Sequence, residues 1–420
     1  MSDNTAQFIS PSQLCIGMYV YLDVGWMDHP FPVNNFEISS QEQIEKIQSL
    51  GLDRVRYLVH KSQSEVTAAT APAAEESRIE ESPKEKQERL RRALLSHQNA
   101  SLLHCEKQFN QATQSFKHIA EQVHTQPILA KEHAQQVVQG LLKGILSEEE
   151  ATIRLLSENA GEKTSLHSVN VTILCLLIGK ALKLNKADMQ ELGIGALLHD
   201  LGKMELPDRL RWQDEQLTSP ERTIYQSHVA HGVNHARKMQ LSDSATLLIA
   251  QHHEYIDGTG YPSRVLGNRM TQLSQIISLV NRYDNLCNPS NVALAITPHE
   301  ALAQLFTKNK AQFDGPTLTA FIKMMGIYPP GSVVQLTNDR YALVTSVNSE
   351  RPIKPKVLIH DPAVPVDNAL IFDLENDPQV GIRRSLKPMQ LPKATYDYLS
   401  PRKRLCYFFE RGAPASETKE

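Results

Sequence analysis

The chain has 420 residues, a length that exceeds one compact core and predicts two or three domains. Hydrophobic residues make up 41% of it, which suffices for ordinary globular folding. Its formal net charge of −3 argues against a generally basic protein that coats nucleic acid, although a local cationic pocket for a small nucleotide stays compatible with it.

Cysteine usage and hydropathy indicate the compartment. The five cysteines are widely spaced without a CxxC pair, as expected for reduced thiols in the cytosol. The polar start, MSDNTAQFIS, lacks the basic and apolar regions of a signal peptide. The most apolar window, VTILCLLIGKAL, contains Lys180 and is too short to span a bilayer. We expect a cytoplasmic protein without membrane insertion and without a nucleic-acid partner.

Residues 1–61 are expected to form a small α+β module. The stretch GMYVYLDV alternates and is rich in aromatic and β-branched residues, as in a half-buried strand. A helical period follows in SSQEQIEKIQSLG, with Ser39 or Ser40 as the N-cap and Gly51 as the stop. The next segment, LDRVRYLVHK, predicts another strand.

Residues 62–88 change in composition to Ala, Pro, Glu, Ser and Lys, with almost no large apolar residue. Such a segment buries too little surface to offset its ordering entropy, so we predict a flexible linker.

A helical pattern, with apolar residues at intervals of three and four, runs from Arg89 to about Met325. We divide it into a connecting helical region, residues 89–150, and an all-helical core, residues 151–325. The connecting region contains four histidines without acidic or cysteine partners at ligand spacing, which we interpret as helix-surface residues. These are His104, His118, His124 and His133.

Strand signals return after Gly326. The stretch IYPPGSVVQLTNDRYALVTSVN predicts two strands joined by a turn at residues 337–339, and KPKVLIHD predicts a further strand. Residues 326–410 are therefore expected to form a small β appendage, and residues 411–420 a disordered tail. The predicted fold class is a multidomain, mainly α protein with an α+β module at one end and the β appendage at the other.

Six side chains of the helical core have the chemistry of metal ligands and lie at or near the ends of predicted helices. In chain order they are His167, His199, Asp200, His228, His252 and His253. Four helices that bring imidazole and carboxylate into one bundle interior are a recurring way to build a dinuclear metal site. Chance often supplies a lone His-Asp pair, whereas six candidates in this order are a much stronger signal.

These residue types suit phosphoester hydrolysis rather than redox chemistry. Imidazoles bind first-row divalent ions, and the two oxygens of Asp200 can bridge two ions ~3.5–4 Å apart, whose shared water is acidified to a hydroxide. Lys203, four residues beyond His199, can place an ammonium beside the same phosphate. His231 and His235 could share a face with His228, but we interpret them as structural or surface residues.

The segments LLHDLGK and HHEYIDGTGYP, with His228 between them, resemble the HD-GYP domain, a subgroup of the HD-superfamily metal phosphohydrolases. The likeness covers roughly residues 150–325. The N-terminal module, with GMYV, GW and HPF, is similar to the uncharacterised domain that often precedes HD-GYP in bacterial proteins. The resemblance implies a metal-dependent phosphodiesterase that hydrolyses the second messenger cyclic di-GMP by a metal-bridged hydroxide, using two or three iron or manganese ions.

Carried over by position, the resemblance implies that the six candidates hold the metals and that Lys203 faces the phosphate. Gly260, Tyr261 and Pro262 match the GYP signature, in a loop beside the nucleotide. The glycines at 258 and 260 permit backbone conformations closed to other residues, and Tyr261 could pack on a guanine or brace the loop. The alternative for this loop is a tight turn and no more.

Three departures from the family pattern bear on the metals. In NRYDNL, Asn281 stands where the family has an aspartate ligand, while Asp284 matches a second, more structural aspartate. The basic RPY element is absent, with CNPSN in its place. Lys163 occupies the position of a glutamate that would support a third ion. We therefore expect two divalent ions, iron or manganese, with Asn281 as a weak ligand.

Two other hypotheses stay open. A catalytically weak HD-GYP adaptor, which binds cyclic di-GMP or a diguanylate cyclase domain, is motivated by Asn281 and by the missing basic element. An HD hydrolase of another nucleotide is the third hypothesis, and the intact GYP tripeptide argues against it. A homodimer is among the assemblies that the sequence leaves open.

Overall fold

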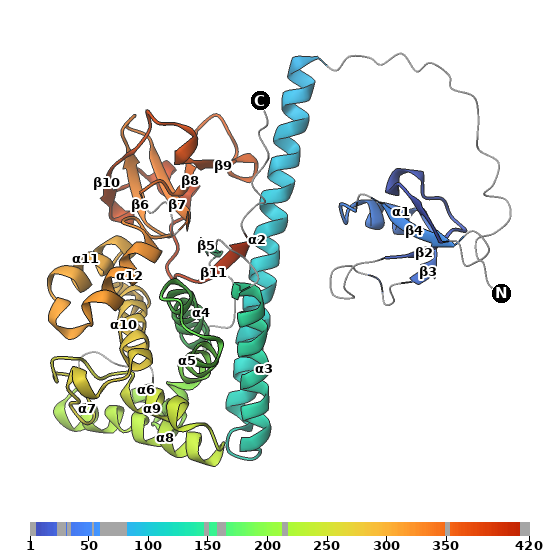
Figure 1. The fold of residues 1–420 in the computed structure, drawn as a ribbon. Helices are drawn as coiled ribbons and strands as arrows, with labels where there is room; N and C mark the ends of the chain where they lie inside the picture. The colour runs from blue at the N-terminus through green and yellow to red at the C-terminus, as the bar shows by residue number, and fades with distance from the viewer. Residues whose placement is uncertain are drawn as a thin grey trace, which may run out of the picture. The chain divides into compact units, whose positions relative to one another are not determined.

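The protein is represented by a computed structural model, and its described residues fall into two compact units, Met1–Ser82 and Pro83–Glu420 (Figure 1). The structure describes residues 6–22, 31, 35–52, 54–58, 82–146, 151–157, 165–211, 217–348 and 353–411.

The first unit contains a four-stranded antiparallel sheet and one helix. Its strands follow the order β1 (Ala6–Ile9), β4 (Val55–Leu58), β2 (Tyr19–Tyr21) and β3 (Asn35–Glu37). Helix α1 (Gln41–Gln48) begins after Ser40, whose hydroxyl accepts the N–H of Gln43. Ile44 and Ile47 of this helix are buried in the unit's own hydrophobic core. The expected α+β module, its capping serine included, is confirmed.

Helix α2 (Pro83–Gln122) corrects the expected linker, because it begins five residues before the predicted end at 88. The segment PKEKQE lacks apolar residues, but it combines a proline in the first turn with strong helix formers. A polar segment that has no apolar side chains to bury can therefore still form the first turns of a helix. Residues 62–81 of the predicted linker lie outside those that the structure describes.

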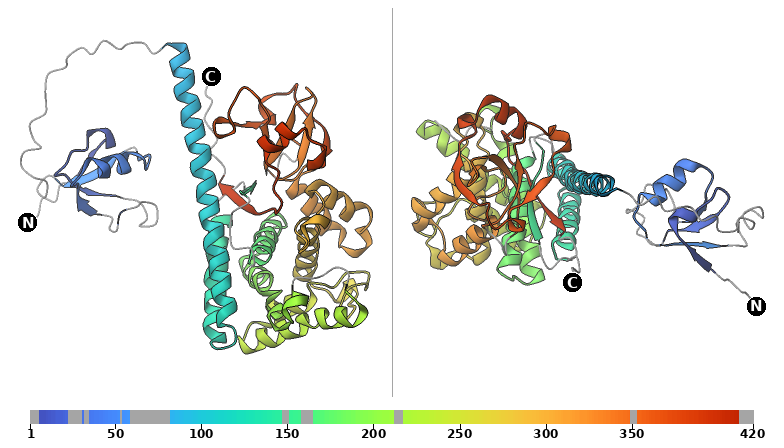
Figure 2. Two further views of the ribbon diagram at one scale, coloured as in Figure 1. Left: turned by 180° about the vertical axis from the view of Figure 1, so that it is seen from behind. Right: turned by 90° about the horizontal axis from the view of Figure 1, so that it is seen from above.

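Helices α2 and α3 (Pro127–Leu146) form a hairpin that packs on the helical body (Figures 1 and 2). Phe109 and Ile119 of α2 are fully buried, as are Ala134 and Val138 of α3, and all four belong to the core shared with the following helices. The region expected only to connect is therefore part of the helical body.

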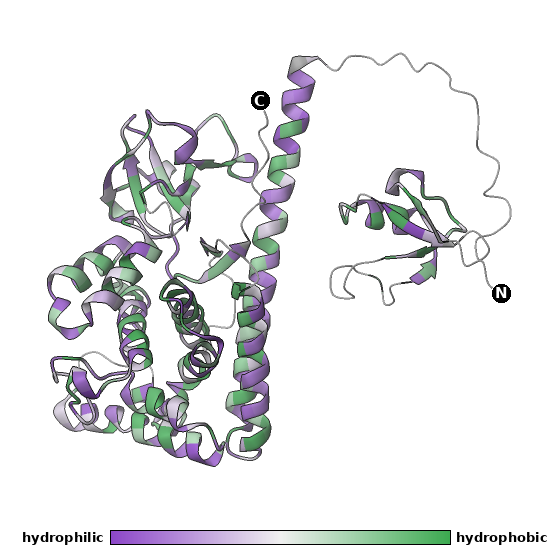
Figure 3. Cartoon of the chain, in the orientation of Figure 1, coloured by the Kyte–Doolittle hydropathy of each residue, from purple (hydrophilic) through white to green (hydrophobic). Residues whose placement is uncertain are grey.

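The helical body surrounds α4 (Leu166–Ala181), which is apolar around almost its whole circumference and therefore central (Figure 3). The other helices are α5 (Lys186–Leu198), η4 (Leu201–Glu205), α6 (Asp208–Arg211), α7 (Ser219–Gln226), α8 (His228–Lys238), α9 (Asp243–Gln251), α10 (Gln272–Cys287), α11 (Pro298–Thr307) and α12 (Gly315–Met325). Within the described part of the chain, no helix combines the length and apolarity needed to cross a bilayer.

Strand β5 and the C-terminal strands form an antiparallel sheet with path β10-β6-β7-β5-β11, to which β8 and β9 add beside β7. Their bounds are β5 (Ala151–Leu155), β6 (Val333–Leu336), β7 (Tyr341–Asn348), β8 (Lys356–Ile359), β9 (Ile371–Asp373), β10 (Ile382–Leu386) and β11 (Tyr407–Arg411), and a short helix α13 (Lys393–Leu399) precedes the last. The predicted turn joins β6 and β7, with Asp339 at φ +63°.

Strand β5 shows that the expected all-helical core is wrong at its first residues. The five residues ATIRL pair with β7 on one side and with β11 on the other. A segment this short carries no reliable period, and its strand character depends on partners that lie far along the chain. Residues 412–420 of the predicted tail lie outside the described residues.

Candidate metal centre

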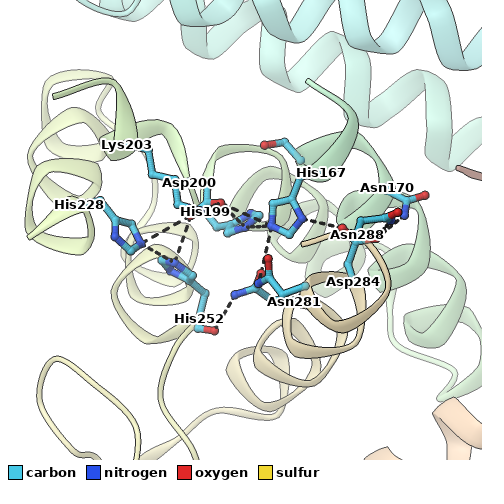
Figure 4. Close-up of polar contacts among 12 residues, drawn as sticks. His167, Asn170, His199, Asp200, Lys203, His228, His252, Asn281, Asp284 and Asn288 are labelled. Carbon is cyan, nitrogen blue, oxygen red and sulfur yellow. Dashed lines mark hydrogen bonds and ion pairs between the residues drawn. The ribbon is translucent and has the colours of Figure 1, made fainter. Parts of the chain in front are cut away.

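The six candidate ligands converge from the ends of four helices, as the sequence predicts. Figure 4 labels all of them except His253. His167 is the second residue of α4, and His199 and Asp200 directly follow α5. His228 begins α8, while His252 and His253 directly follow α9. Helix ends thus direct the side chains inward, while the helix bodies form the apolar core around them.

Asp200 divides the ligands into two clusters that share its carboxylate. Its Oδ2 lies 3.4 Å from Nε2 of His167 and 3.4 Å from Nε2 of His199. Its Oδ1 lies 3.5 Å from Nε2 of His228 and 3.6 Å from Nε2 of His252. One carboxylate oxygen therefore faces each histidine pair, which is the arrangement of a carboxylate that bridges two ions.

The second ring nitrogen of three of the histidines fixes their tautomer. Nδ1 of His199, His228 and His252 donates to the carbonyl three residues earlier in the chain, at 2.7 Å in each case. The neutral ring then has a lone pair on Nε2. Nε2 of His228 and His252 are only 3.2 Å apart, and so are those of His167 and His199. In the pair of His228 and His252, two lone pairs that face each other so closely repel unless a cation lies between them.

Burial keeps most of these imidazoles neutral. Burial is the main reason why the pKa of His199 falls to about 4 and that of His228 to about 3. Burial also holds the pKa of His253 well below its usual range, and its Nε2 is buried without a hydrogen-bond partner. Neutral rings with available lone pairs are the protonation state that a divalent metal requires.

His167 is held by Asp284 of α10, whose Oδ2 lies 2.6 Å from Nδ1 of His167. Burial alone would lower the pKa of His167, but the hydrogen bond to Asp284 and the carboxylate charges outweigh it and raise that pKa. Asp284 also accepts hydrogen bonds from Asn170 and Asn288. A carboxylate behind a histidine orients the ring and increases its basicity as a ligand, which matches the structural role expected for Asp284.

Asn281 presents its side-chain oxygen to the cluster of His167 and His199. Its Oδ1 lies 3.1 Å from Nε2 of His167 and accepts from Nδ2 of Asn285 at 2.9 Å. Its Nδ2 donates to the carbonyl of His252 at 3.3 Å. These contacts orient the amide, so a neutral oxygen lies where the resemblance implied a carboxylate.

Lys203 lies against the bridging carboxylate, with Nζ 2.6 Å from Oδ2 of Asp200 and 5.4 Å from the centre of the Tyr225 ring. Burial would raise the pKa of Asp200, but the Lys203 and His199 contacts hold it well below its usual range. In turn, the carboxylate raises the pKa of Lys203 despite burial. The pair is therefore ionised throughout the neutral range.

The GYP loop packs on the second cluster. The ring of Tyr261 stacks on His253 with centroids 4.4 Å apart, and its N–H donates to the His253 carbonyl at 3.1 Å. A Cβ on Gly260 would lie 2.5 Å from that carbonyl oxygen and 2.5 Å from Cα of Glu254, so only glycine fits. Of the two roles expected for Tyr261, the structure shows the brace. Pro262 follows in a cis peptide bond.

Several supporting residues were missed by the sequence analysis. Glu254 is fully buried, and its carboxylate accepts the N–H groups of Ser263 at 2.7 Å and Val265 at 3.0 Å, which shapes the loop. Asn170 offered a signal, because it is a lone amide in the apolar segment that became α4. Lys163, at the position discussed for a third ion, lies outside the described residues.

One histidine contact was not anticipated from the sequence. His124 has an acidic partner, because its Nε2 lies 3.3 Å from Oε1 of Glu205, and the same oxygen lies 2.8 Å from Nε2 of the buried His235. Spacing along the chain could not reveal this group, since the three residues come from separate elements.

Two family descriptions match the chain. The HD domain matches residues 141–317, and a domain of unknown function, DUF3391, matches residues 7–134. The chain is therefore an HD-domain protein with an N-terminal DUF3391 domain, which confirms the resemblance drawn from the motifs. The DUF3391 match continues through α2 into α3, beyond the module expected at residues 1–61.

Curated relatives within this class are phosphodiesterases of cyclic dinucleotides. A cyclic di-GMP phosphodiesterase of Pseudomonas aeruginosa is 27% identical over 362 residues, which cover 84% of each chain. A cyclic di-GMP phosphodiesterase of Borreliella burgdorferi is 26% identical, and the match covers 46% of this chain and 51% of the relative. A 3'3'-cGAMP-specific phosphodiesterase of Vibrio cholerae is 28% identical, with 40% of this chain and 36% of the relative covered.

Among solved structures, an HDG"Y"P protein from Bdellovibrio bacteriovorus is similar with a TM-score of 0.39 and 17% identity. The match covers 76% of this chain and 98% of that chain.

Proposed function

We propose that the chain is a metal-dependent phosphodiesterase that hydrolyses cyclic di-GMP. The observation that carries this proposal is the position of Asp200, which directs one oxygen toward each of two histidine pairs whose Nε2 atoms are 3.2 Å apart. Pairs of ring nitrogens on either side of a shared carboxylate fit two divalent ions.

His167, His199, Asp200 and the oxygen of Asn281 would hold one ion, and Asp200, His228, His252 and His253 the other. Imidazole and carboxylate donors suit iron(II) or manganese(II), which we propose as the resident metals. When bound, the ions would supply Lewis-acid stabilisation of the phosphoryl oxygens and a water of lowered pKa.

The chain's own residues would bind and orient the phosphodiester. Lys203 is ionised and lies 2.6 Å from Asp200, so its ammonium can stabilise a phosphoryl oxygen held beside that carboxylate. Gly260, Tyr261 and Pro262 form a loop that is fixed to His253 and provides one wall beside the second cluster. We propose that this loop contacts the nucleotide.

The choice of substrate rests on the relatives. Two of the reported relatives are named for cyclic di-GMP and one for 3'3'-cGAMP, so both cyclic dinucleotides are candidate substrates. We propose cyclic di-GMP because the relative that covers most of this chain is named for it. Hydrolysis in the cytoplasm would lower the messenger and so affect motility and biofilm formation.

The test is hydrolysis by the purified full chain after reconstitution with iron(II), manganese(II) or zinc(II), with the bound metal quantified. Cyclic di-GMP and 3'3'-cGAMP are compared at equal concentration, and His199→Ala serves as the inactive control. We expect turnover of cyclic di-GMP that requires metal and is lost in the control. Turnover of 3'3'-cGAMP alone would reject the substrate, and turnover unaffected by His199→Ala would reject the site.

A second function is favoured by one observation, the neutral oxygen of Asn281 at the first cluster. A weaker ligand there supports an adaptor that binds the nucleotide, or a diguanylate cyclase domain, without rapid hydrolysis. Tight binding of cyclic di-GMP without turnover under any metal would favour this function. Sedimentation of the chain alone would test whether it forms a homodimer, and sedimentation of a mixture with a diguanylate cyclase domain would test that partner.

A further inference from the structure

Three polar side chains meet at a place that the proposed reaction does not use. They are His124 in the turn between α2 and α3, Glu205 at the end of η4, and His235 on α8. Oε1 of Glu205 lies 2.8 Å from Nε2 of His235 and 3.3 Å from Nε2 of His124. A tetrahedral zinc ion with bonds of about 2.1 Å holds its ligand atoms about 3.4 Å apart, so small side-chain movements would complete such a site.

Burial and charge support an ion at this place. The side chain of His235 is 4% exposed, whereas those of Glu205 and His124 are 33% and 46% exposed, so the group opens to solvent on one side. Within the described residues, the ion pairs of Glu205 are with these two histidines, and no lysine or arginine joins them. Burial lowers the pKa of His235, which keeps this ring neutral at neutral pH.

We propose that His124, Glu205 and His235 form a second divalent-metal site, which binds zinc(II) with a water as the fourth ligand. Two imidazoles and one carboxylate with an open position are a common ligand set for this ion. The site is independent of the proposed hydrolysis, because none of its residues belongs to the metal centre.

The position of the site gives it a structural consequence. Glu205 ends the short η4 segment that also contains Lys203, while His124 belongs to the α2–α3 hairpin. An ion bound by both would tie the hairpin to the segment that carries the phosphate-facing lysine. Nδ1 of His235 is buried without a hydrogen-bond partner, so this ligand lacks the supporting acceptor that strong sites have. Binding is therefore weaker than at the metal centre and exchangeable.

The chain offers a matched control on the same hairpin. His118 and His133 are also neighbours, with ring centroids 5.4 Å apart, but Gln122 rather than a carboxylate bonds to both rings. Replacement of His118 thus removes an exposed histidine from a histidine pair without touching the proposed site.

The experiment is equilibrium dialysis of the metal-stripped full chain against zinc(II), for the wild type, His124→Ala, Glu205→Gln and His118→Ala. We expect the wild type and His118→Ala to bind one more zinc than the other two variants, or to bind it at least tenfold more tightly, the scale of effect seen when even a supporting partner is lost. In zinc-soaked crystals, anomalous scattering should place this ion between the three side chains.

Equal zinc stoichiometry and affinity in the wild type and in both His124→Ala and Glu205→Gln would overturn the proposal and leave a hydrogen-bonded contact. His124 is half exposed in a turn, so its replacement is compatible with folding, which circular dichroism checks. The comparison among variants reports only this site. A chain that fails to hydrolyse any cyclic dinucleotide would still show the zinc difference, and a chain that hydrolyses one could lack it.

Discussion

Two groups of histidines in the described part of the second unit differ in what holds the second ring nitrogen. In the metal centre, Nδ1 of His199, His228 and His252 donates to a backbone carbonyl. In the group of His124, Glu205 and His235, Nδ1 of His235 is buried without a partner, and His124 is half exposed. Similar side chains thus lie at similar distances in both groups, but only in the metal centre do hydrogen bonds to the second nitrogen orient the rings. Such a hydrogen bond to the ligand is what separates a tight metal site from a weak one.

Asp200→Asn is expected to have the largest effect, because it removes the charge shared by both clusters and the partner of Lys203. Hydrolysis should fall by more than about 100-fold, the loss typical when one electrostatic stabiliser of a transition state is removed. Initial rates at saturating metal provide the measurement. Asp208→Asn changes an exposed carboxylate on α6 and should leave the rate unchanged. A rate for Asp200→Asn within a few-fold of wild type would contradict the bridging role.

Asp284→Asn tests the support behind His167 directly. The change removes the charged acceptor of Nδ1 and leaves the ligand itself in place. We expect the affinity for one of the two ions to fall about 10–100-fold while the other ion stays bound, as for other supporting partners of metal ligands. Manganese titration followed by electron paramagnetic resonance separates the two events. An equal loss of affinity for both ions would show that Asp284 stabilises the fold rather than one ligand.

Gly260→Ala tests whether the GYP loop depends on the close contact between Gly260 and the backbone of residues 253 and 254. The added methyl group must displace the loop, and the strain of overpacking costs about 1–3 kcal/mol. The free energy of unfolding, from urea titration, should fall by this amount, and KM should rise as Tyr261 leaves His253. Gly140→Ala is the control, since its added Cβ meets nothing within 4 Å and alanine favours helix α3. Equal stability of the two variants would contradict the loop argument.

The sequence was sufficient to select the side chains that converge at the candidate metal centre, because their order follows helix ends that local periodicity reveals. His167, His199 and His228 could be selected without knowing any contact between helices. The same reasoning could not reveal the contact of His124 with Glu205 or the strand β5, because their partners are defined only by tertiary packing. Glu254 was missed for a related reason, since its role depends on N–H groups of a loop whose course the sequence does not specify.

Asn281→Asp is expected to have the smallest effect and to separate the two candidate functions. A carboxylate near Nε2 of His167 should bind the first ion more tightly, by up to about tenfold, a difference of about 1.4 kcal/mol. The gain is limited because Nδ2 of Asn281 donates to the His252 carbonyl, and loss of such a bond costs about 1 kcal/mol. Metal titration and kcat are measured together. A higher metal affinity together with a higher kcat would show that the asparagine limits the activity of an enzyme. A higher metal affinity without turnover would favour the adaptor.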